Sequence, residues 1–228
     1  MCGRYKLTVP FREIVRLYEL TNSTSDRFDN LRPRYNIAPT QEVAVIRLDA
    51  SRRREFATLR WGLIPFWAKD VKVGYSLINA MSETVADKPS FREAFKTRRC
   101  LAIADGFYEW KPMPGKLKQP YLIRMFNDAP FAFAGPWEMW KDKGTGEVIE
   151  SCTIITCPPN ALCSPIHNRM TAILAPEDYA AWLGEVEATP DQLKALLRPF
   201  TADLMEAIPI STKVNSVKND SAAVLEAD

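Results

Sequence analysis

The sequence predicts an α+β fold in a single domain, residues 1–228, whose largely antiparallel sheet curls toward a barrel. Short β-prone runs punctuated by proline, glycine, aspartate and asparagine outnumber the helical segments. Seventeen prolines are scattered along the chain, which is typical of a β-rich fold with many shaped loops. The 228 residues, 46% of them hydrophobic, suffice for one well-buried core, and no repeat or low-complexity linker divides them.

The predicted strands follow the short runs of β-branched, aromatic and aliphatic residues. They are residues 43–48, 55–63, 99–110, 120–126, 131–139 and 151–157. A first helix is predicted over residues 10–20, where Phe11, Ile14 and Tyr18 share one face at helical spacing and Pro10 suits the first helical position.

Capping boxes, in which a hydroxyl residue precedes Glu or Gln by three positions, predict two further helices. These are Ser90 with Glu93 for a helix over 91–97, and Thr189 with Gln192 for a helix over 190–198. Pro176 similarly predicts the start of a helix that carries Tyr179, Trp182 and Leu183.

Bulk properties exclude several classes of protein. No run of ~18 or more apolar residues and no secretory signal pattern is present, so we expect a soluble, cytoplasmic protein without a membrane partner. Five cysteines, an odd number, are expected to be free thiols in a reducing compartment. A net charge of +2 excludes a heavily basic coat, although Arg52–Arg54 and Arg98–Arg99 could line a local groove.

Cys2 is the residue most directly linked to chemistry. An initiator methionine before a small residue is normally removed, which would leave Cys2 with a free α-amine beside its thiol. Both groups ordinarily have a pKa near 8 (~7.7–8.5), so both carry reactive fractions at neutral pH. The amine can condense with an aldehyde, and the thiol can then close a thiazolidine ring with an effective molarity on the order of 10⁵ M. Alternatively, Cys2 merely follows the start codon.

Two titratable side chains are candidates for proton transfer. His167, the only histidine, follows a proline-containing turn beside Arg169. It is either structural or a general acid/base beside an anion-binding guanidinium. Glu109 ends a β-prone run between Tyr108 and Trp110, whose rings could desolvate it and raise its pKa. The alternative is a surface glutamate on an edge strand.

Polar and aromatic candidates complete the set. Asn79 ends an apolar segment, and its amide either caps a turn or orients an imine or a sugar hydroxyl. Trp61, Phe66 and Trp67 lie on a segment with a proline at 65. These rings are either core residues or stack on unpaired bases, each stack being worth ~1–3 kcal/mol.

No metal or cofactor is expected. Cys152, Cys157, Cys163 and His167 are close in sequence, but there is no Cys-x₂₋₄-Cys pair, and on one strand residues 152 and 157 would point to opposite faces. A Walker-type phosphate loop and a dinucleotide fingerprint are also absent.

Six spaced motifs together resemble the SOS response-associated peptidase family, the abasic-site processing proteins. In chain order they are residues 1–5 (MCGRY), 34–39 (RYNIAP), 61–65 (WGLIP), 79–80 (NA) with 83–84 (ET), 105–110 (DGFYEW) and 167–170 (HNRM). They are spread over about three quarters of the chain, and residues 214–215 and 219–220 extend them toward the C-terminus.

The resemblance implies a one-domain, β-rich fold with a positively charged channel that binds single-stranded DNA at an abasic site, where the deoxyribose opens to an aldehyde. By similarity, Cys2 forms a thiazolidine DNA–protein crosslink and Asn79 positions the sugar. Glu109 and His167 handle the proton transfers of ring opening and imine formation.

The resemblance also implies contacts with the DNA strand and a cellular setting. Arg4 and Arg169 would clamp phosphates that flank the lesion, and Phe66 and Trp67 would stack beside it. The protein is expected to act as a monomer in the SOS response and DNA repair, associated with the nucleoid when engaged with DNA. The replication machinery is a candidate partner, and autoproteolysis and a lyase activity are candidate further activities.

Two positions depart from the family pattern. Met81 stands where the family usually has arginine, and Thr171 where it usually has proline. Losing that arginine should remove one phosphate contact and flatten the salt dependence of binding by roughly one unit of slope.

Two other functions remain open. One is a hydrolase of peptides or amides that uses Cys2 as nucleophile and its α-amine as base, with removal of the preceding residue as one case. The other is a non-covalent single-strand binder that relies on the aromatic loop and the arginines alone.

Overall fold

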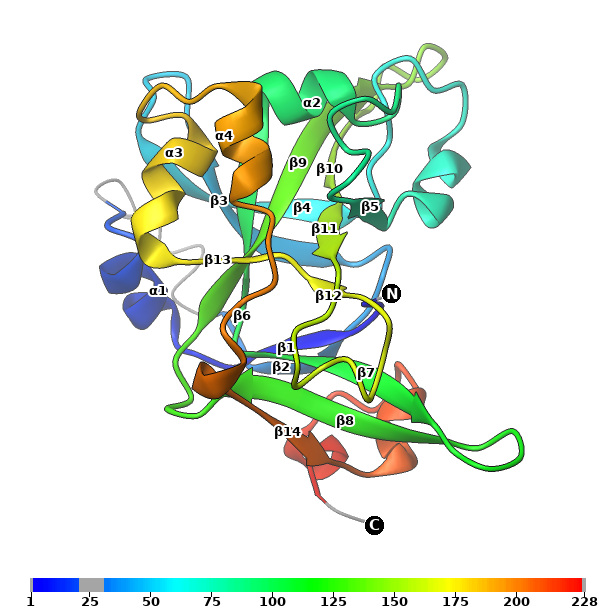
Figure 1. Ribbon diagram of the computed structural model, residues 1–228. Coiled ribbons are helices and arrows are strands. Elements are labelled where there is room, and N and C mark those ends of the chain that lie inside the picture. Colours follow the sequence, from blue (N-terminus) through cyan, green and yellow to red (C-terminus); the bar gives the residue numbers. More distant parts are fainter. Residues whose placement is uncertain (1, 21–30, 227–228) are drawn as a thin grey trace.

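The structure, a computed structural model, describes residues 2–20 and 31–226 and confirms the α+β class (Figure 1). Its strands are β1 (Tyr5–Leu7), β2 (Arg34–Ile37), β3 (Glu42–Leu48), β4 (Arg54–Trp61), β5 (Asn79–Met81), β6 (Arg99–Ala104), β7 (Gly106–Pro112), β8 (Lys118–Met125), β9 (Phe131–Lys141), β10 (Val148–Cys152), β11 (Ile154–Cys157), β12 (Met170–Thr171), β13 (Ile173–Leu174) and β14 (Met205–Pro209). Its α-helices are α1 (Phe11–Leu17), α2 (Arg92–Thr97), α3 (Tyr179–Leu183) and α4 (Pro190–Ala195). Its 3₁₀ helices are η1 (Val71–Ser76), η2 (Pro176–Asp178), η3 (Ala202–Leu204), η4 (Thr212–Asn215) and η5 (Ala222–Val224).

The central sheet closes into a barrel, as the sequence predicts. Strands β10, β4, β3, β6 and β9 pair in that order, and β10 pairs again with β9, which completes the ring. Every pairing in this ring is antiparallel except β10 with β4, where Cys152 lies opposite Trp61 in parallel register. Closure leaves no open edge in this part of the sheet.

Two smaller sheets flank the barrel. One has the order β14-β8-β7-β1-β2, and the other has the order β12-β11-β5 with β11 and β5 parallel. Figure 1 shows β7, β8 and β14 at one end of the molecule and helices α2, α3 and α4 at the other. Strand β1 pairs with β7 and so belongs to the sheet opposite these helices.

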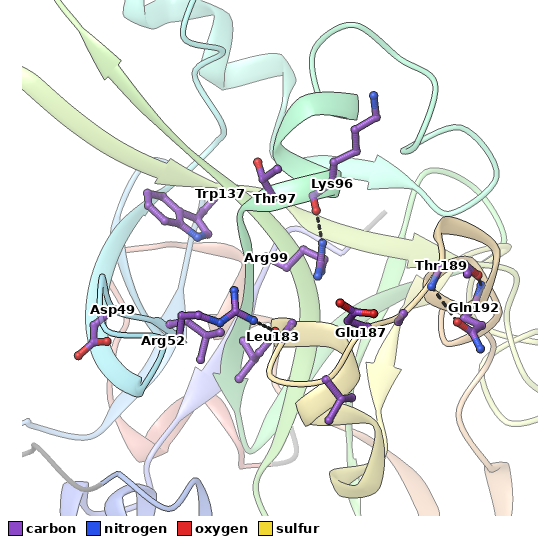
Figure 2. A pocket seen from close by; sticks show the side chains of 14 residues that line it. Asp49, Arg52, Lys96, Thr97, Arg99, Trp137, Leu183, Glu187, Thr189 and Gln192 are labelled. Atoms are coloured by element: carbon purple, nitrogen blue, oxygen red, sulfur yellow. Dashed lines mark hydrogen bonds between the residues drawn. The ribbon is translucent and has the colours of Figure 1, made fainter.

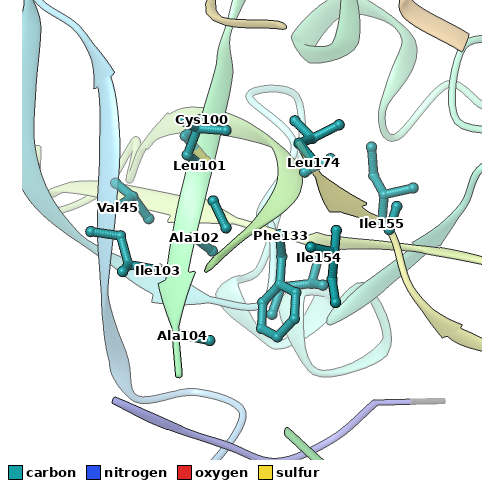
Figure 3. Packing of buried hydrophobic residues seen from close by; sticks show 14 of the residues in the cluster. Val45, Cys100, Leu101, Ala102, Ile103, Ala104, Phe133, Ile154, Ile155 and Leu174 are labelled. Carbon is teal, nitrogen blue, oxygen red and sulfur yellow. The ribbon is translucent and has the colours of Figure 1, made fainter. Parts of the chain in front are cut away.

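The core is continuous between the barrel and its neighbours (Figure 3). Every residue of β6 after Arg99 is buried. Helix α3 covers this strand, and the Trp182 indole N–H donates to the Cys100 carbonyl at 2.9 Å. On the other side, Phe133 meets Tyr5 edge-on with ring centroids 5.6 Å apart. These aromatic contacts fix β1 against the barrel and so determine where the N-terminus emerges.

Two of the predicted strands are each divided in two. The run 99–110 divides at Asp105, where β6 of the barrel ends before β7 of the five-stranded sheet begins. The Asp105 carboxylate accepts hydrogen bonds from Thr8, which hold the chain where it passes between the sheets. The run 151–157 divides at Thr153, because β10 and β11 belong to different sheets.

The capping-box predictions had opposite outcomes. The box of Thr189 and Gln192 is confirmed, with reciprocal hydrogen bonds of 3.2 and 2.8 Å. The box at Ser90 is wrong, since the cap of α2 is Phe91 and no side chain bonds its first turn.

The other helix boundaries shift by a few residues. Helix α1 ends at Leu17 instead of residue 20, and Pro10 is its cap residue instead of its first helical residue. Pro176 begins η2, which leads directly into α3 with the buried Tyr179 and Trp182. None of the helices in the described part of the chain is long and apolar enough to cross a bilayer.

The short strands β1, β2, β5, β12, β13 and β14 are not predicted from the sequence. Each has two to five residues, too few for an alternating pattern to stand out. Asn79, which ends an apolar segment of the sequence, is the first residue of β5.

Candidate active site

Strand β1 brings Cys2 beside the middle of β7. The two strands are antiparallel, with Tyr5 opposite Phe107, and the Tyr108 N–H donates to the Arg4 carbonyl at 3.0 Å. Followed toward the N-terminus, this register places Cys2 next to the part of β7 that carries Glu109.

Cys2 is fully buried in the described chain, which has Met1 before it. Its Sγ lies 3.5 Å from the Arg4 carbonyl oxygen, to which it donates. Burial and the negative charge of Glu109 raise the pKa of the thiol. The thiol is therefore protonated at neutral pH and is not poised as a thiolate.

Glu109 is buried without a compensating cation. It is 2% exposed, its Oε1 has no hydrogen-bond partner among the described residues, and none of the ion pairs found in that part of the chain includes it. Two positions from Phe107 on the same strand, it faces the core. Burial raises its pKa from 4.5 to about 7. Near neutrality this carboxyl can therefore both donate and accept a proton.

His167 lies on the segment between β11 and β12. Its Nδ1 is 3.1 Å from both the backbone N–H and the carbonyl oxygen of Arg169. The N–H can donate to an unprotonated Nδ1, and the carbonyl can accept from a protonated one, so the same backbone accommodates both forms. Burial lowers the pKa of His167, which favours a neutral ring at pH 7.

Asn79 is held at the start of β5 by its pairing with Ile154. Its Nδ2 donates to the Ile154 carbonyl at 3.3 Å, whereas its Oδ1 is buried and has no partner among the described residues. Buried amide oxygens are rarely left unbonded. The Asn79 and Glu109 side chains thus both present an unpaired acceptor.

A chain of contacts joins β1 to the strand that carries Asn79. Tyr5 packs on Trp61 with ring centroids 5.4 Å apart, and the Trp61 indole N–H donates to the Ile78 carbonyl at 2.8 Å. Ile78 is the residue before Asn79. The N-terminal strand and β5 are therefore connected through one buried indole.

Arg4, predicted to clamp a phosphate, already has protein partners. Its Nη1 donates to the Asn36 side chain at 2.9 Å and to the Val214 carbonyl at 2.7 Å, and its Nη2 donates to the Asn215 carbonyl at 3.2 Å. These bonds fasten β1 to the C-terminal segment. Nε and one Nη2 hydrogen have no hydrogen bond in the described structure, so the phosphate contact stays a prediction.

Arg169, the other predicted phosphate clamp, pairs with an acidic side chain. Its guanidinium forms a bidentate ion pair with Glu83, and its Nη2 also donates to the Thr156 carbonyl at 2.5 Å. This pair lowers the pKa of Glu83. The fork holds the segment that carries His167 against β11, and a phosphate would have to share this arginine with Glu83.

The aromatic segment after β4 separates into a core part and an exposed part. Trp61 is fully buried, whereas Phe66 and Trp67 are 56% and 51% exposed. The Ile64 N–H donates to the Ser151 hydroxyl at 2.8 Å, and the Ala68 carbonyl accepts from the Trp140 indole N–H at 2.8 Å. Phe66 and Trp67 are therefore displayed by a loop that is fixed at both ends.

Two residues near the site, Lys118 and Cys163, are not among the site residues predicted from the sequence. Burial raises the pKa of Glu109 and lowers that of His167, and the charge of Lys118, on β8, opposes the first shift and adds to the second, so Lys118 lies near both groups. Cys163 is buried on the His167 segment, and burial together with the charge of Glu109 raises its pKa to about 12. Neither residue stands in a motif, and their proximity to Glu109 depends on pairings across the fold.

The two positions that depart from the family pattern lie in different environments. Met81 is 40% exposed at the end of β5, where an arginine would reach solvent. Thr171 is fully buried on β12, and its hydroxyl has no partner among the described residues. The structure gives no reason for threonine at this position.

A cavity of about 790 Å³ lies at the helical end of the molecule, away from these residues (Figure 2). Its walls come from the turn after β3, the end of α2 and the connection between α3 and α4, and none of the predicted site residues lines it. Arg52 and Arg99 point toward it, but each donates to backbone carbonyls that hold these elements together. In residues 2–20 and 31–226, no three His, Cys, Asp or Glu side chains form a cluster suited to a metal ion.

Comparisons with known proteins agree with this arrangement. The family described as SOS response associated peptidase (SRAP) matches residues 1–217. The chain is 44% identical over 231 residues to the abasic site processing protein YoaM of Bacillus subtilis (strain 168), covering 100% of this chain and 99% of that protein. It is 33% identical over 271 residues to the abasic site processing protein HMCES of Mus musculus, covering 99% of this chain and 75% of that protein.

A solved structure shows the same fold. A crystal structure of a protein from Bacteroides thetaiotaomicron superposes with a TM-score of 0.87 at 26% identity, covering 100% of both chains. The family match over residues 1–217 includes every predicted site residue. The chain therefore belongs to the SOS response associated peptidase (SRAP) family and is a relative of the abasic site processing proteins.

Proposed function

We propose that this protein binds single-stranded DNA at an abasic site and, once Met1 is removed, forms a thiazolidine crosslink between Cys2 and the aldehyde of the ring-opened deoxyribose. The observation that carries the proposal is Glu109, a carboxyl on the strand beside Cys2 that is buried and forms no ion pair among the described residues. Burying such a group costs stability, so its position next to an N-terminal nucleophile favours a role in proton transfer.

The first chemical step is opening of the sugar and condensation with the α-amine of Cys2. His167, neutral at pH 7, takes the proton of the anomeric hydroxyl and passes it to the ring oxygen, whose bond to C1 breaks to leave the aldehyde and a free hydroxyl. The amine nitrogen then bonds to the aldehyde carbon, and Glu109 carries two protons in turn from the nitrogen to the former carbonyl oxygen. The first makes that oxygen a hydroxyl, and the second lets it leave as water while the C=N bond forms. A carboxyl with a pKa of about 7 can perform both halves of this transfer. The unpaired Oδ1 of Asn79 accepts a hydrogen bond from the sugar.

Ring closure follows on the imine. Sγ of Cys2 bonds to the former aldehyde carbon, the C=N electron pair moves to nitrogen, and the S–H proton ends on that nitrogen. Water is thus the only molecule released over both steps. Because burial raises the pKa of the thiol, it keeps its proton until the imine is in place. This order suits crosslinking better than hydrolysis, which requires a thiolate at the outset.

Removal of Met1 is required in this mechanism. It turns the amide nitrogen of Cys2 into an amine, the form that can condense with an aldehyde. The protein that still carries Met1 is therefore expected to be inert toward aldehydes. Phe66 and Trp67, about half exposed on a fixed loop, would support the bases beside the lesion.

The test is a crosslinking assay. Met1-free protein is mixed with a uracil-containing single strand that a glycosylase has converted to an abasic strand, and a heat-stable band of reduced mobility is expected. Cys2→Ala should give no band. Cys163→Ala is the matched control, since it removes another buried thiol that senses Glu109 and should leave crosslinking intact. No band from wild type, or an undiminished band from Cys2→Ala, would contradict the proposal.

A non-covalent binder would behave differently in solution. It predicts equal affinity for intact and abasic strands, whereas the proposed site predicts a preference for the abasic strand. Fluorescence anisotropy at two salt concentrations separates the two, because the phosphate contacts weaken with salt while the lesion preference is retained.

Self-processing is a second candidate activity, favoured by the peptidase description of the family and by Glu109 beside the bond that precedes Cys2. In a host without methionine aminopeptidase activity, intact-mass analysis should show Met1 lost from wild type and retained in Glu109→Ala. Retention of Met1 in wild type as well would rule out self-processing and leave the crosslinking proposal unaffected.

A further inference from the structure

Tyr75 is an exposed aromatic residue that the predicted site does not include. It lies on η1 and is 57% exposed, as much as Phe66 and Trp67. The Cζ of Arg60, on β4, lies 5.7 Å from the centroid of its ring, within the range of a cation–π contact. One ring face is therefore backed by a guanidinium, and much of the side chain remains open to solvent.

Arg60 carries a charge that no acidic side chain of the described residues neutralises through an ion pair. Its Nη1 donates to the Thr40 carbonyl at 3.2 Å, and its Nε is buried without a hydrogen-bond partner in that part of the structure. Glu42 lies opposite Arg60 across the β3–β4 pair, and the two form no ion pair. The guanidinium thus retains donors for a further acceptor.

The Tyr75 element and the loop that displays Phe66 and Trp67 form one packed unit. A Cβ added to Gly62 would lie 2.6 Å from the Gly74 carbonyl oxygen, and one added to Gly74 would lie 2.7 Å from the Gly62 carbonyl oxygen. The Leu63 N–H also donates to the Leu77 carbonyl at 3.2 Å. Only glycine at both positions permits this approach, so the three rings are held on one rigid support.

This support ends at the proposed reaction site. Tyr75 precedes Asn79 by four residues, so the two Cα atoms lie at most about 14 Å apart. At about 3.4 Å of axis per nucleotide in a stacked strand, that distance corresponds to about four nucleotides. A strand bound at Asn79 therefore reaches Tyr75 within a few nucleotides.

We propose that Tyr75 and Arg60 form an additional subsite for the DNA strand, in which a nucleobase stacks on the exposed ring and a neighbouring phosphate binds the guanidinium. This inference rests on the proposed function and extends it, because it sets how far from the lesion the strand is held. It also assigns to Arg60 a phosphate contact separate from those predicted for Arg4 and Arg169.

The experiment measures reversible binding to strands that contain a tetrahydrofuran abasic analogue, which has no aldehyde and cannot crosslink. One strand has about two nucleotides on each side of the lesion, and two others are extended by about six nucleotides on the 5′ or the 3′ side. Tyr75→Ala should weaken binding to one extended strand by about 5- to 150-fold and leave the minimal strand unaffected. Tyr75→Phe, which keeps the ring, should bind like wild type.

Arg60→Gln tests the phosphate contact separately. Its binding to the same extended strand should lose about 0.7 of the slope of log affinity against log salt. An unchanged slope would overturn the phosphate contact. Tyr75→Ala binding within about twofold of wild type on both extended strands, or an equal loss on all three strands, would overturn the stacking subsite.

Failure of this subsite is distinguishable from failure of the proposed function. Crosslinking of a true abasic strand by wild type is measured in parallel. If wild type crosslinks the abasic strand but Tyr75→Ala binds the extended strands as wild type does, the subsite alone is contradicted. If Tyr75→Ala weakens binding but wild type forms no crosslink, the chemistry proposed for Cys2 is contradicted.

Discussion

Asp105 and Glu109 are buried carboxylates four positions apart, and their surroundings differ in one respect. Asp105, 3% exposed, lies 2.9 Å from the Lys6 ammonium and accepts two hydrogen bonds from Thr8. Glu109, 2% exposed, has neither a cation partner nor a hydrogen bond to Oε1 among the described residues. Burial alone therefore does not distinguish these two acids; their partners do.

The difference has a physical cause in the position of each residue. Asp105 stands where the chain passes from the barrel to the second sheet, and its charge is compensated by β1 and the residues after it. Glu109 lies farther along β7 and takes part in none of the ion pairs of the described residues, although the charge of Lys118, on β8, opposes the rise of its pKa. A buried carboxyl without an ion-pair partner is a candidate for proton transfer, as proposed above.

Neutralising Glu109 is expected to have the largest effect. Glu109→Gln keeps the shape of the side chain but cannot transfer a proton, so the single-turnover crosslinking rate at pH 7 should fall by about 10² to 10⁴. Its stability to urea should not fall, because no ion pair is lost. Glu138→Gln, which alters a buried carboxylate that pairs with Arg98, is the matched control and should crosslink normally. A wild-type rate for Glu109→Gln would remove the distinction between the two acids.

Removing Asp105 should give the opposite result. Asp105→Ala leaves the Lys6 ammonium, which is 9% exposed, without its partner and should destabilise the protein by about 3–5 kcal/mol in urea unfolding. The double variant Lys6→Met with Asp105→Leu replaces the pair by apolar groups and should recover most of this loss. A single variant as stable as wild type would mean that the pair does not hold β1 in place.

The pH dependence of stability should report the raised pKa of Glu109. Its pKa rises from 4.5 to about 7 on folding, so between these values the folded state binds the proton that the unfolded state has lost. The free energy of unfolding therefore falls by roughly 3 kcal/mol as pH rises through this window, and the loss is complete above pH 7. The difference in unfolding free energy between Glu109→Gln and wild type should grow by that amount, and a constant difference would contradict it.

Met81→Arg should have the smallest effect. The side chain at this position is 40% exposed, so an arginine could reach a phosphate and steepen the salt dependence of single-strand binding by about 0.7 in slope. The crosslinking rate at saturating protein should stay the same, since proton transfer at Glu109 does not involve this charge. A changed saturated rate would show that phosphate binding and the carboxyl are coupled.

The sequence nominates the candidate reactive residues but does not reveal their environments. Cys2, Asn79, Glu109 and His167 are nominated by residue type and motif, and their catalytic roles stay predictions. Asp105 has a cation partner because the fold brings Lys6, nearly a hundred positions away in the chain, beside it. Glu109 forms no ion pair among the described residues. Local composition cannot reveal such a pairing.

The same limit applies to the fold. The long strands and the Thr189 capping box follow from local patterns, because alternation and capping act over a few residues. The Ser90 box has the same local signature but fails, since tertiary packing buries Phe91 at that cap. The division of the run 99–110 at Asp105 likewise needs two sheets that only the folded chain brings together.

By itself, the sequence determined the α+β class and the family and nominated Cys2 as the candidate nucleophile, because these depend on residue identity, spacing and local pattern. The tertiary structure alone decided which arginines are already occupied, which carboxyl is left without a partner, and that Tyr75 shares a rigid support with Phe66 and Trp67. Those properties depend on which side chains meet across the fold, and contacts between distant residues are set by packing, which no local pattern contains.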